Sequence, residues 1–530
     1  MSQRTSQMSW SGWGEPNRAQ PLSLDLRQLL RDALGVRRDG PSVPRLAELR
    51  PPTSQLSSAH LEELATIVGP AHVTAGDEAR IRHLRGKSTP DLLALRAGDL
   101  AAAPDAVVWP ASHAEVLELL GVCASHRIAV VPFGGGTSVV GGLAPARAGH
   151  RAVVALDLNR LNRLLSLDEI SRLATLEPGL RGPDAEAELA ARGYTLGHFP
   201  QSFEFASIGG FAATRSSGQA SAGYGRFDER VVAIRVATPG GTVTLGQAPK
   251  SAAGPDLREL FLGSEGTLGV ITSVTVEIAP APEVRRYEGW RLPDFAAGRE
   301  VVRRLVQDGP LPSVLRLSDE VETALNLARP DAVGTGQGTG SLLICGWEGA
   351  AGTVRTAVQG SDKILRAAGA EPAEEAGPAW AAGRFAAPYL RDALLDAGAL
   401  VETLETACFW SGLPDLYEAV RQALVQSLGD AGTPPVVLCH ISHVYRSGAS
   451  LYFTVACAQA DDPLEQWRRA KAAASDAILA AGGSITHHHG VGTEHRAWYH
   501  RQLGELPLAA LRAAKRELDP AGILNPGVLV

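Results

Sequence analysis

Cysteine is scarce and scattered in this sequence. The 530 residues include five cysteines, and no two of them form a C-x-x-C pair. An odd, dispersed set argues against a disulfide framework and against a zinc site, and it favours a reducing compartment. We therefore expect no disulfides and no bound metal.

Long apolar runs and an excess of basic residues are also missing. No apolar run reaches the roughly 20 residues that a membrane-spanning helix needs. The opening residues are polar and lack the apolar segment of a signal peptide. The formal net charge is −7, whereas nucleic-acid-binding proteins normally carry a basic surface. These absences predict a cytoplasmic protein without a nucleic-acid partner.

The sequence does contain ample apolar material and a clear order of secondary structure. Apolar residues make up 45% of the chain, which is enough for a sizeable core. The apolar spacing of 113–123 predicts a helix, and several short β-branched runs predict strands. The strands are expected at 128–131, 153–158, 173–177 and 270–278, with a hairpin of 231–236 and 242–245 around Pro239-Gly240-Gly241.

Three glycine-rich segments, at 132–138, 201–225 and 263–272, are the main candidates for ligand binding. In the first, Gly134, Gly135 and Gly136 follow a predicted strand and remove the Cβ atoms that would block a close backbone approach. Their N–H groups can then converge on the oxygens of a pyrophosphate. A plain tight turn is the rival interpretation of that loop alone, and the G-x-G-x-x-G spacing of a Rossmann fold is absent. Three such segments in one chain are hard to explain as unrelated turns.

These segments resemble the FAD-contacting elements of the vanillyl-alcohol-oxidase/PCMH-type flavoprotein superfamily. The resemblance covers nearly the whole chain and implies an α+β fold, in which a two-part FAD-binding domain is covered by a mixed α/β cap and the C-terminal segment returns to the FAD domain. It implies FAD as cofactor, bound non-covalently by our interpretation. The implied FAD contacts are Pro132, Phe133, Gly134, Gly135, Gly136, Thr137, Ser138, Gln201, Ser202, Phe203, Glu204, Phe205, Ala206, Ser207, Thr214, Arg215, Ser216, Ser217, Glu265, Gly266, Thr267, Leu268, Gly269, Val270 and Ile271.

The same resemblance divides the chain into four parts. Ala279-Pro280-Ala281-Pro282 interrupts the strand pattern and suggests a boundary. We expect an N-terminal helical segment at 1–100, the FAD-binding domain at 101–285, the cap at 286–489 and a C-terminal segment at 490–530. Within the cap, the glycine-rich stretch 334–340 is expected to form a surface loop.

Two features of the second half narrow the resemblance to the alkyldihydroxyacetone-phosphate synthase family. His487, His488 and His489 precede Gly490-Val491-Gly492, where related 2-hydroxy-acid dehydrogenases carry a single histidine. Tyr452 stands where those dehydrogenases carry the second histidine of a metal-binding element. The segments WSGWG, APYLRD and LRLSD also resemble the synthases.

This family exchanges the acyl chain of an acyl-dihydroxyacetone phosphate for a long-chain alcohol, without net redox change. The resemblance implies that Tyr452 is the proton donor and acceptor. His487, His488 and His489 would assist it, while Arg391 would clamp the substrate phosphate and Arg316 would be a second substrate-side cation.

Other interpretations remain open for these residues. The three adjacent histidines could instead form a solvated turn or a metal site. In a strand, successive side chains point to opposite faces, so the three histidines would not face one substrate equally. Tyr452 lies in an apolar run and competes with an ordinary core tyrosine, and Arg391 competes with a surface ion pair. The final residues ILNPGVLV are closer to the dehydrogenases. The alternative functions are therefore an FAD-linked dehydrogenase or oxidase of a 2-hydroxy acid or alcohol, and a flavoprotein without catalysis.

The resemblance implies a lipid-like small-molecule substrate, and from this we expect particular binding partners. The protein would touch a membrane surface peripherally without spanning it. Relatives of this kind are often dimers, so a homodimer is the assembly that we expect.

Overall fold

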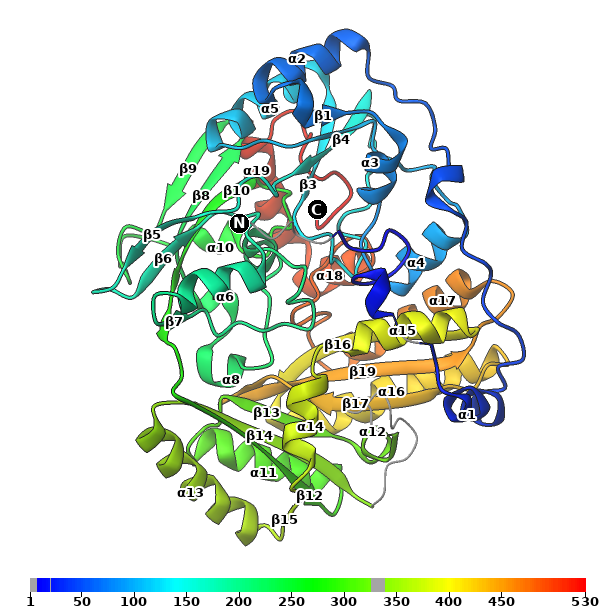
Figure 1. The fold of residues 1–530 in the computed structure, drawn as a ribbon, viewed down its shortest axis with the longest axis vertical. Coiled ribbons are helices and arrows are strands. Elements are labelled where there is room, and N and C mark those ends of the chain that lie inside the picture. The colour runs from blue at the N-terminus through cyan, green and yellow to red at the C-terminus, as the bar shows by residue number, and fades with distance from the viewer. Residues whose placement is uncertain (1–6, 20, 326–338) are drawn as a thin grey trace.

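The chain folds into two lobes around a shared interior, as a computed structural model shows for residues 7–19, 21–325 and 339–530. Residues 334–338 of the expected glycine-rich loop lie outside this described part. In Figure 1 the first lobe, residues 50–281 with the C-terminal residues 485–530, occupies the upper half. The second lobe, residues 284–480, lies below it around a long sheet.

The first lobe contains a mixed four-stranded sheet in the order β1-β2-β4-β3. Strands β2 and β3 pair in parallel with β4, and β1 pairs antiparallel with β2. Helix α5 connects β2 to β3, and Ser112 caps it by accepting a hydrogen bond from the Glu115 amide. The expected helix at 113–123 and strand at 128–131 are thus confirmed. The bounds are β1 Val73–Thr74, β2 Ala106–Val108, α5 His113–His126, β3 Ile128–Phe133 and β4 Ala152–Asp157.

A second, antiparallel sheet of the first lobe has the order β5-β6-β10-β8-β9. It includes the expected hairpin, β8 and β9, and the expected strand β10, which begins within the third glycine-rich segment. The bounds are β5 Leu164–Asp168, β6 Leu173–Leu176, β8 Val231–Thr238, β9 Gly241–Leu245 and β10 Val270–Glu277, with α6 Gly182–Ala190, α7 Ile208–Ala213, α8 Ser221–Tyr224, α9 Phe227–Arg230 and α10 Arg258–Phe261, and with β7 Tyr194–Thr195 pairing β11 Ala279–Pro280.

The second lobe is built on one antiparallel sheet in the order β15-β12-β14-β13-β17-β19-β16, to which β18 adds at β19. Four helices, α11, α13, α16 and α17, pack on one face through the largest apolar cluster of the described residues. The bounds are β12 Val284–Leu292, α11 Phe295–Gln307, β13 Val314–Ser318, α12 Glu320–Leu325, β14 Ser341–Gly349, α13 Ala351–Ala367, β15 Glu371–Pro372, α14 Ala376–Gly383, α15 Ala387–Asp396, β16 Ala399–Phe409, η5 Trp410–Gly412, α16 Leu413–Asp430, β17 Val436–Ile441, β18 Val444–Tyr445, β19 Gly448–Ala458 and α17 Pro463–Ala480.

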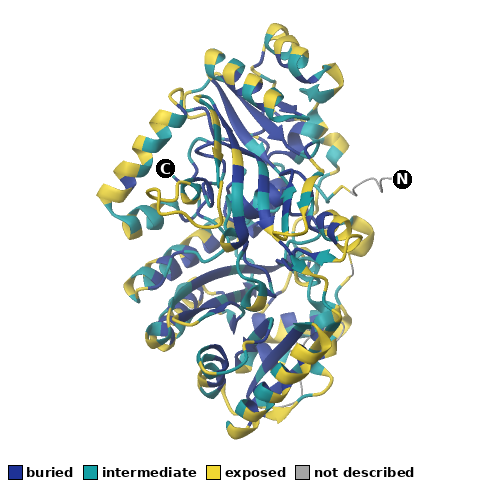
Figure 2. Ribbon diagram, turned by 90° about the vertical axis from the view of Figure 1, so that its left-hand side faces the viewer, coloured by how far each residue is buried: buried dark blue, intermediate teal, exposed yellow. Residues whose placement is uncertain are grey.

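The strands of this sheet carry different residues on their two faces. Along β19, Leu451, Phe453 and Val455 are buried against the helices, whereas Tyr452 and Thr454 face the first lobe. Figure 2 shows the buried residues concentrated in the sheets of both lobes and the exposed ones on the outer helices. The alternation leaves one face of the sheet free to build a site.

Both ends of the described chain contact this arrangement. Helix α1, Leu24–Leu34, packs through Leu30 and Leu34 against Ala399 and Val401 of the second lobe. The C-terminal residues return to the first lobe, where Asn525 N donates to Val130 O. The remaining bounds are η1 Pro16–Arg18, η2 Leu46–Glu48, α2 Ser58–Val68, η3 Pro70–His72, α3 Asp77–Arg82, α4 Thr89–Arg96, α18 Arg496–Leu503 and α19 Glu505–Leu518.

Two expected absences can be compared with the structure. All five cysteines are free. Among the described helices, none combines the length and the apolar character that crossing a membrane requires.

Candidate active site

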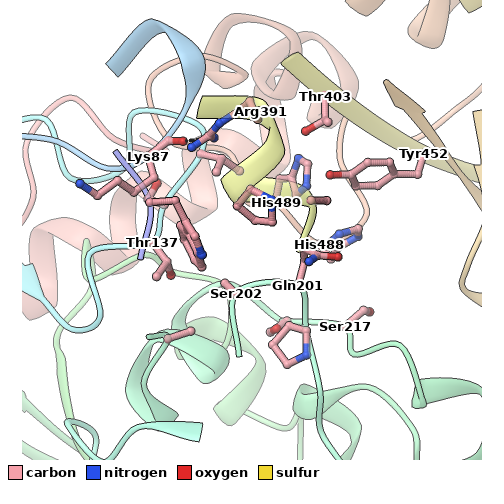
Figure 3. A pocket seen from close by; sticks show the side chains of 18 of the residues that line it. Lys87, Thr137, Gln201, Ser202, Ser217, Arg391, Thr403, Tyr452, His488 and His489 are labelled. Atoms are coloured by element: carbon pink, nitrogen blue, oxygen red, sulfur yellow. Dashed lines mark hydrogen bonds between the residues drawn. The ribbon is translucent and has the colours of Figure 1, made fainter. Parts of the chain in front are cut away.

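A cavity of about 520 Å³ lies between the two lobes. Its walls come from the first two glycine-rich segments and the start of β10 in the first lobe, and from β16, β17, β19 and α15 in the second. Figure 3 shows Thr137, Gln201, Ser202 and Ser217 on the first-lobe side, with Arg391 and Tyr452 across from them. Segments that are far apart in the sequence thus meet at one site.

The first glycine-rich loop lies so close to its neighbours that side chains are excluded. A Cβ atom on Gly135 would overlap the carbonyl oxygen of Phe205, and one on Gly134 would overlap the hydroxyl of Ser207. Gly136 has a φ of +71°, which favours glycine. Gly134, Gly135 and Gly136 all line the cavity, so the loop places backbone and not side chains at this part of the wall, as close contact with a pyrophosphate requires.

Most of the residues predicted to contact FAD line this cavity. The ones that do are Pro132, Phe133, Gly134, Gly135, Gly136, Thr137, Ser138, Gln201, Ser202, Ala206, Ser207, Thr214, Ser216, Ser217, Glu265, Gly266, Gly269, Val270 and Ile271.

Six predicted cofactor residues are not brought to the cavity wall, and each has other partners. Phe203 stacks on Phe385, and the Phe205 ring packs edge-on against Trp13. Glu204 pairs with Arg18, and Arg215 pairs with Asp228 and Glu259. Thr267 and Leu268 are completely buried.

Two unpartnered polar atoms suit the binding of a polar ligand. Gln201 Nε2 and His443 Nδ1 are buried and have no hydrogen-bond partner among the described residues, and both residues line the cavity. Buried polar groups are normally paired. The glycine backbone at the cavity wall and these polar atoms fit a cofactor of the FAD type.

A row of side chains crosses the second-lobe sheet at the cavity. Glu405 on β16, Tyr452 on β19 and His440 on β17 are paired neighbours in the strand register, so their side chains share one face. The Tyr452 ring lies between His440, at a centroid distance of 4.8 Å, and His488, at 6.1 Å. Burial raises the pKa of Tyr452 to about 12, so the phenol keeps its proton at neutral pH.

Glu405 fixes the backbone of the three histidines. Its buried carboxylate accepts hydrogen bonds from the amides of His487, His488 and His489 and from the Thr486 hydroxyl, at 2.6–3.1 Å. Burial opposes its ionisation, but the imidazoles outweigh burial and hold the pKa of Glu405 well below its usual range. The sequence prediction missed Glu405, although a charged residue within the apolar run 399–409 was a signal.

The three histidines have different surroundings because Glu405 curls their backbone into an irregular turn instead of a strand. His488 and His489 line the cavity. The structure does not bring His487 to the cavity wall: its Nε2 contacts the Tyr445 hydroxyl at 2.6 Å and the Arg226 guanidinium at 3.2 Å. Burial lowers the pKa of all three imidazoles, that of His489 to about 3.

Three histidine nitrogens lie close together at this turn. Ring nitrogens of His443, His487 and His488 are within 4.8 Å of one another, a spacing that a metal ion could use. The guanidinium of Arg226 lies against His487, and this positive charge opposes cation binding. The absence of a metal therefore stays a prediction.

Arg316 reaches the cavity from β13 as part of a buried charge network. Its guanidinium pairs with Glu322 at 2.5 Å and contacts His440 Nε2 at 2.8 Å, while His440 Nδ1 contacts Glu322 at 3.1 Å. Burial opposes ionisation of Glu322, yet His440 and Arg316 lower its pKa to about 2. Arg316 is thus held beside the ring that stacks on Tyr452.

Arg391 lines the other side of the cavity, on α15. It donates to Asp392 Oδ1 through Nε and Nη2, at 3.1 and 2.9 Å, and to the Lys87 carbonyl through Nη1, at 2.6 Å. A guanidinium has five N–H donors, so two stay available for a ligand. Lys87 also lines the cavity, and burial lowers its pKa to about 7. Sequence analysis gave no signal for Lys87.

Beyond these polar groups the cavity becomes apolar. Helix α1 contributes Leu26, Leu29, Leu30, Ala33 and Leu34 to its wall, and the second lobe contributes Leu390, Leu394, Val401, Val436, Leu438 and Ala456. One end of the cavity therefore suits an ionic group and the other an aliphatic chain.

Comparison with known proteins agrees with this geometry. The sequence model described as "FAD binding domain" matches residues 104–246, and the one described as "FAD linked oxidases, C-terminal domain" matches residues 281–529. The p-cresol methylhydroxylase structure, at 17% identity, has a TM-score of 0.71 over 90% of this chain and 98% of that chain, which supports the fold. The chain is therefore an FAD-linked enzyme of the PCMH-type fold, as its sequence predicted.

Relatives at higher identity define the family within that class. The alkyldihydroxyacetonephosphate synthases of Dictyostelium discoideum and Trypanosoma brucei brucei are 33% and 31% identical to it, over 90% and 99% of this chain and 83% and 92% of theirs. A solved structure of an alkyldihydroxyacetonephosphate synthase superimposes with a TM-score of 0.84, at 29% identity, covering 98% of both chains. The chain belongs to the alkyldihydroxyacetonephosphate synthase family.

Proposed function

We propose that this enzyme exchanges the acyl chain of acyl-dihydroxyacetone phosphate for a long-chain alcohol and so forms the ether bond of ether lipids. The observation that carries the proposal is the two-ended cavity. Arg391, Arg316, Tyr452 and two histidines gather at one end, and aliphatic side chains line the other. A phosphorylated ketone and an alkyl chain match these two ends.

The polar end supplies binding and proton transfer. Arg391 has two free donors for a phosphate, and its rigid fork suits that group. Bound FAD supplies an electrophilic ring that can accept a carbon nucleophile. The imidazole of His488 can accept a proton from the carbon next to the ketone. The protonated phenol of Tyr452, stacked on His488, can return a proton to that carbon, and the proton that the imidazole took up then restores the phenol.

The apolar end explains why an alcohol can replace the acyl group. Once the carboxylate has left, an alcohol that lies along α1 presents its hydroxyl to the polar end. The walls exclude water from the apolar end, which protects the reacting carbon from hydrolysis.

A labelled-alcohol exchange assay tests this function. The holoenzyme receives acyl-dihydroxyacetone phosphate and a labelled long-chain alcohol, and we expect label in a product that resists alkaline hydrolysis. Tyr452→Phe should lower this turnover at least 100-fold while FAD stays bound. Tyr417→Phe is the matched control, because Tyr417 packs on Phe453 at the opposite face of the same sheet. Anaerobic bleaching of the flavin by a 2-hydroxy acid, without label in the lipid, would refute the proposal in favour of a dehydrogenase.

The lipid substrate also implies peripheral contact with a membrane, and we propose a cytoplasmic homodimer that binds the membrane surface. Leu24, at the start of α1, is 82% exposed beside the apolar end of the cavity. Flotation with phospholipid vesicles and sedimentation equilibrium test the two parts. Leu24→Asp should weaken flotation, and a monomer at micromolar concentration would refute the dimer.

A further inference from the structure

The N-terminal residues Ser9 to Gly14, which we call the strap, contribute Trp13 to the cavity wall. Lys87 Nζ donates to the carbonyls of Ser9 and Trp10, at 2.7 and 3.2 Å, and Arg96 Nε donates to that of Ser11 at 3.0 Å. The strap is thus fastened to the body of the first lobe at three successive carbonyls.

The second half of the strap lies tightly against α15. The Trp13 amide donates to Asp392 Oδ2. A Cβ atom on Gly12 would overlap that carboxylate, and one on Gly14 would overlap the Tyr389 ring. Asp392 also accepts the two hydrogen bonds from Arg391, so a single carboxylate positions both Trp13 and the arginine.

The side chain of Trp13 lies at the cavity, and its indole N–H has no hydrogen-bond acceptor among the described residues. Trp13 is 5% exposed, lines the cavity, and packs edge-on against Phe205 at 5.6 Å. Its indole Nε1 is buried and has no hydrogen-bond partner within the described parts of the chain. Indole N–H groups are donors only, and they normally find a partner when buried. Trp290, Trp347 and Trp467 share this feature, but they lie in the core of the second lobe and not at the cavity.

The chemistry around Trp13 indicates the partner. The Phe205 ring contacts Trp13, and the Phe205 backbone lies against Gly135 of the glycine-rich loop, which lines the cavity. Lys87 and Arg391 both line the cavity on the side where the strap is fastened. The Arg391 guanidinium, the Lys87 amino group, the glycine backbone at the cavity wall and a neutral N–H donor together suit a phosphate oxygen.

We propose that Trp13 is a ligand-binding residue whose indole N–H donates a hydrogen bond to a phosphate oxygen in the cavity. That oxygen belongs either to the pyrophosphate of FAD or to the phosphate of the substrate. The second source rests on the proposed function, whereas the first rests on FAD binding alone.

Trp13→Phe removes the donor and keeps an aromatic ring, and Trp10→Phe is the matched control in the same strap. Two dissociation constants are measured for each protein: that of FAD from the apoprotein, by quenching of flavin fluorescence, and that of dihydroxyacetone phosphate from the holoenzyme, by the change in flavin absorbance. Losing a hydrogen bond to a charged group should raise the affected constant roughly 10- to 100-fold. We expect this in Trp13→Phe and less than about a twofold change in Trp10→Phe.

Each outcome decides the question. A rise for FAD assigns the contact to the pyrophosphate, and a rise for dihydroxyacetone phosphate alone assigns it to the substrate. If Trp13→Phe leaves both constants at their original values, the proposal is wrong. Failure of the original protein to bind dihydroxyacetone phosphate refutes the proposed substrate, and the FAD measurement still decides the role of Trp13.

A second measurement applies if Trp13→Phe does not fold. Among the described residues, Trp13 and Trp380 are the tryptophans that line the cavity. In ¹⁵N-tryptophan-labelled Trp380→Phe protein, one indole N–H resonance should move downfield on adding FAD to the apoprotein or dihydroxyacetone phosphate to the holoenzyme. No movement with either compound overturns the proposal.

Discussion

Replacing Glu405 with glutamine should disable the enzyme through the histidine turn, although Glu405 is not proposed to touch the substrate. Its Oε1 accepts from Thr486 Oγ1, His488 N and His489 N, and its Oε2 accepts from His487 N at 2.7 Å. A glutamine oxygen at the first position can keep three of these hydrogen bonds. The glutamine NH₂ at the second position would then face the N–H of His487, and two donors would be opposed.

The magnitude follows from that one mismatch. A hydrogen bond to a charged group contributes about 1.5–3 kcal/mol, and an unpaired buried N–H costs about 1–3 kcal/mol. Glu405 is 1% exposed, so water cannot replace the lost partner. We therefore expect Glu405→Gln to lower the free energy of unfolding by about 2–5 kcal/mol. Since His488 and His489 follow the displaced amide, turnover should fall at least tenfold.

The assay combines thermal unfolding of the holoenzyme with the labelled-alcohol exchange. Glu177→Gln is the control, because Glu177 is a buried carboxylate of the first lobe that pairs with Arg163 and does not line the cavity. It should lower stability and leave turnover of the folded enzyme unchanged. The negative charge of Glu405 raises the pKa of His488. Because Glu405→Gln removes this charge, the acid limb of the pH profile of turnover should shift to lower pH. A Glu405→Gln enzyme with the original turnover and pH profile would refute this reasoning.

Three other predictions follow from buried contacts. Gly135→Ala should abolish FAD binding, seen as colourless protein, because its Cβ meets a backbone carbonyl, whereas Gly121→Ala, with open space around it, should stay yellow. Burial lowers the pKa values of His198 and His495 to about 3. Because these histidines take up protons near pH 6.5 in the unfolded chain, the free energy of unfolding should fall as the pH drops below about 6.5, by roughly 1–2 kcal/mol per histidine at pH 5. An equal urea midpoint at pH 7.5 and pH 5 would contradict this prediction. Glu322→Gln should raise KM and lower the melting temperature, because Arg316 loses its buried carboxylate partner. If both values stay unchanged, His440 alone holds the Arg316 guanidinium.

The sequence predicted the fold and much of the cavity wall because those features are local. Three successive glycines, Gly134 to Gly136, suggest a phosphate-binding loop without reference to the rest of the chain. The helix α5 and the strand β3 are likewise predicted from the local spacing of apolar residues. Glu405 could not be placed in this way, because its partners lie 81–84 residues further along the chain. A turn was one interpretation of the three histidines, but as a solvated one. The sequence could not show that Glu405 buries this turn at the cavity, and the strand alternation that we also considered assumes a backbone that the structure does not have.

Two carboxylates, one from each lobe, hold the turn that carries the three histidines. Glu265, from the first lobe, accepts from the amides of Val491 and Gly492 at 2.6 and 2.9 Å, and Glu405, from the second lobe, holds residues 486–489. One short segment is therefore fixed from both sides, and its histidines sit where the lobes meet. If the segment transmits the placement of one lobe to the other, Glu265→Gln and Glu405→Gln should be non-additive in stability, with a coupling of about 0.5–3 kcal/mol in a double-mutant cycle. Strict additivity would mean that the two carboxylates act independently, and that the position of His488 depends on Glu405 alone.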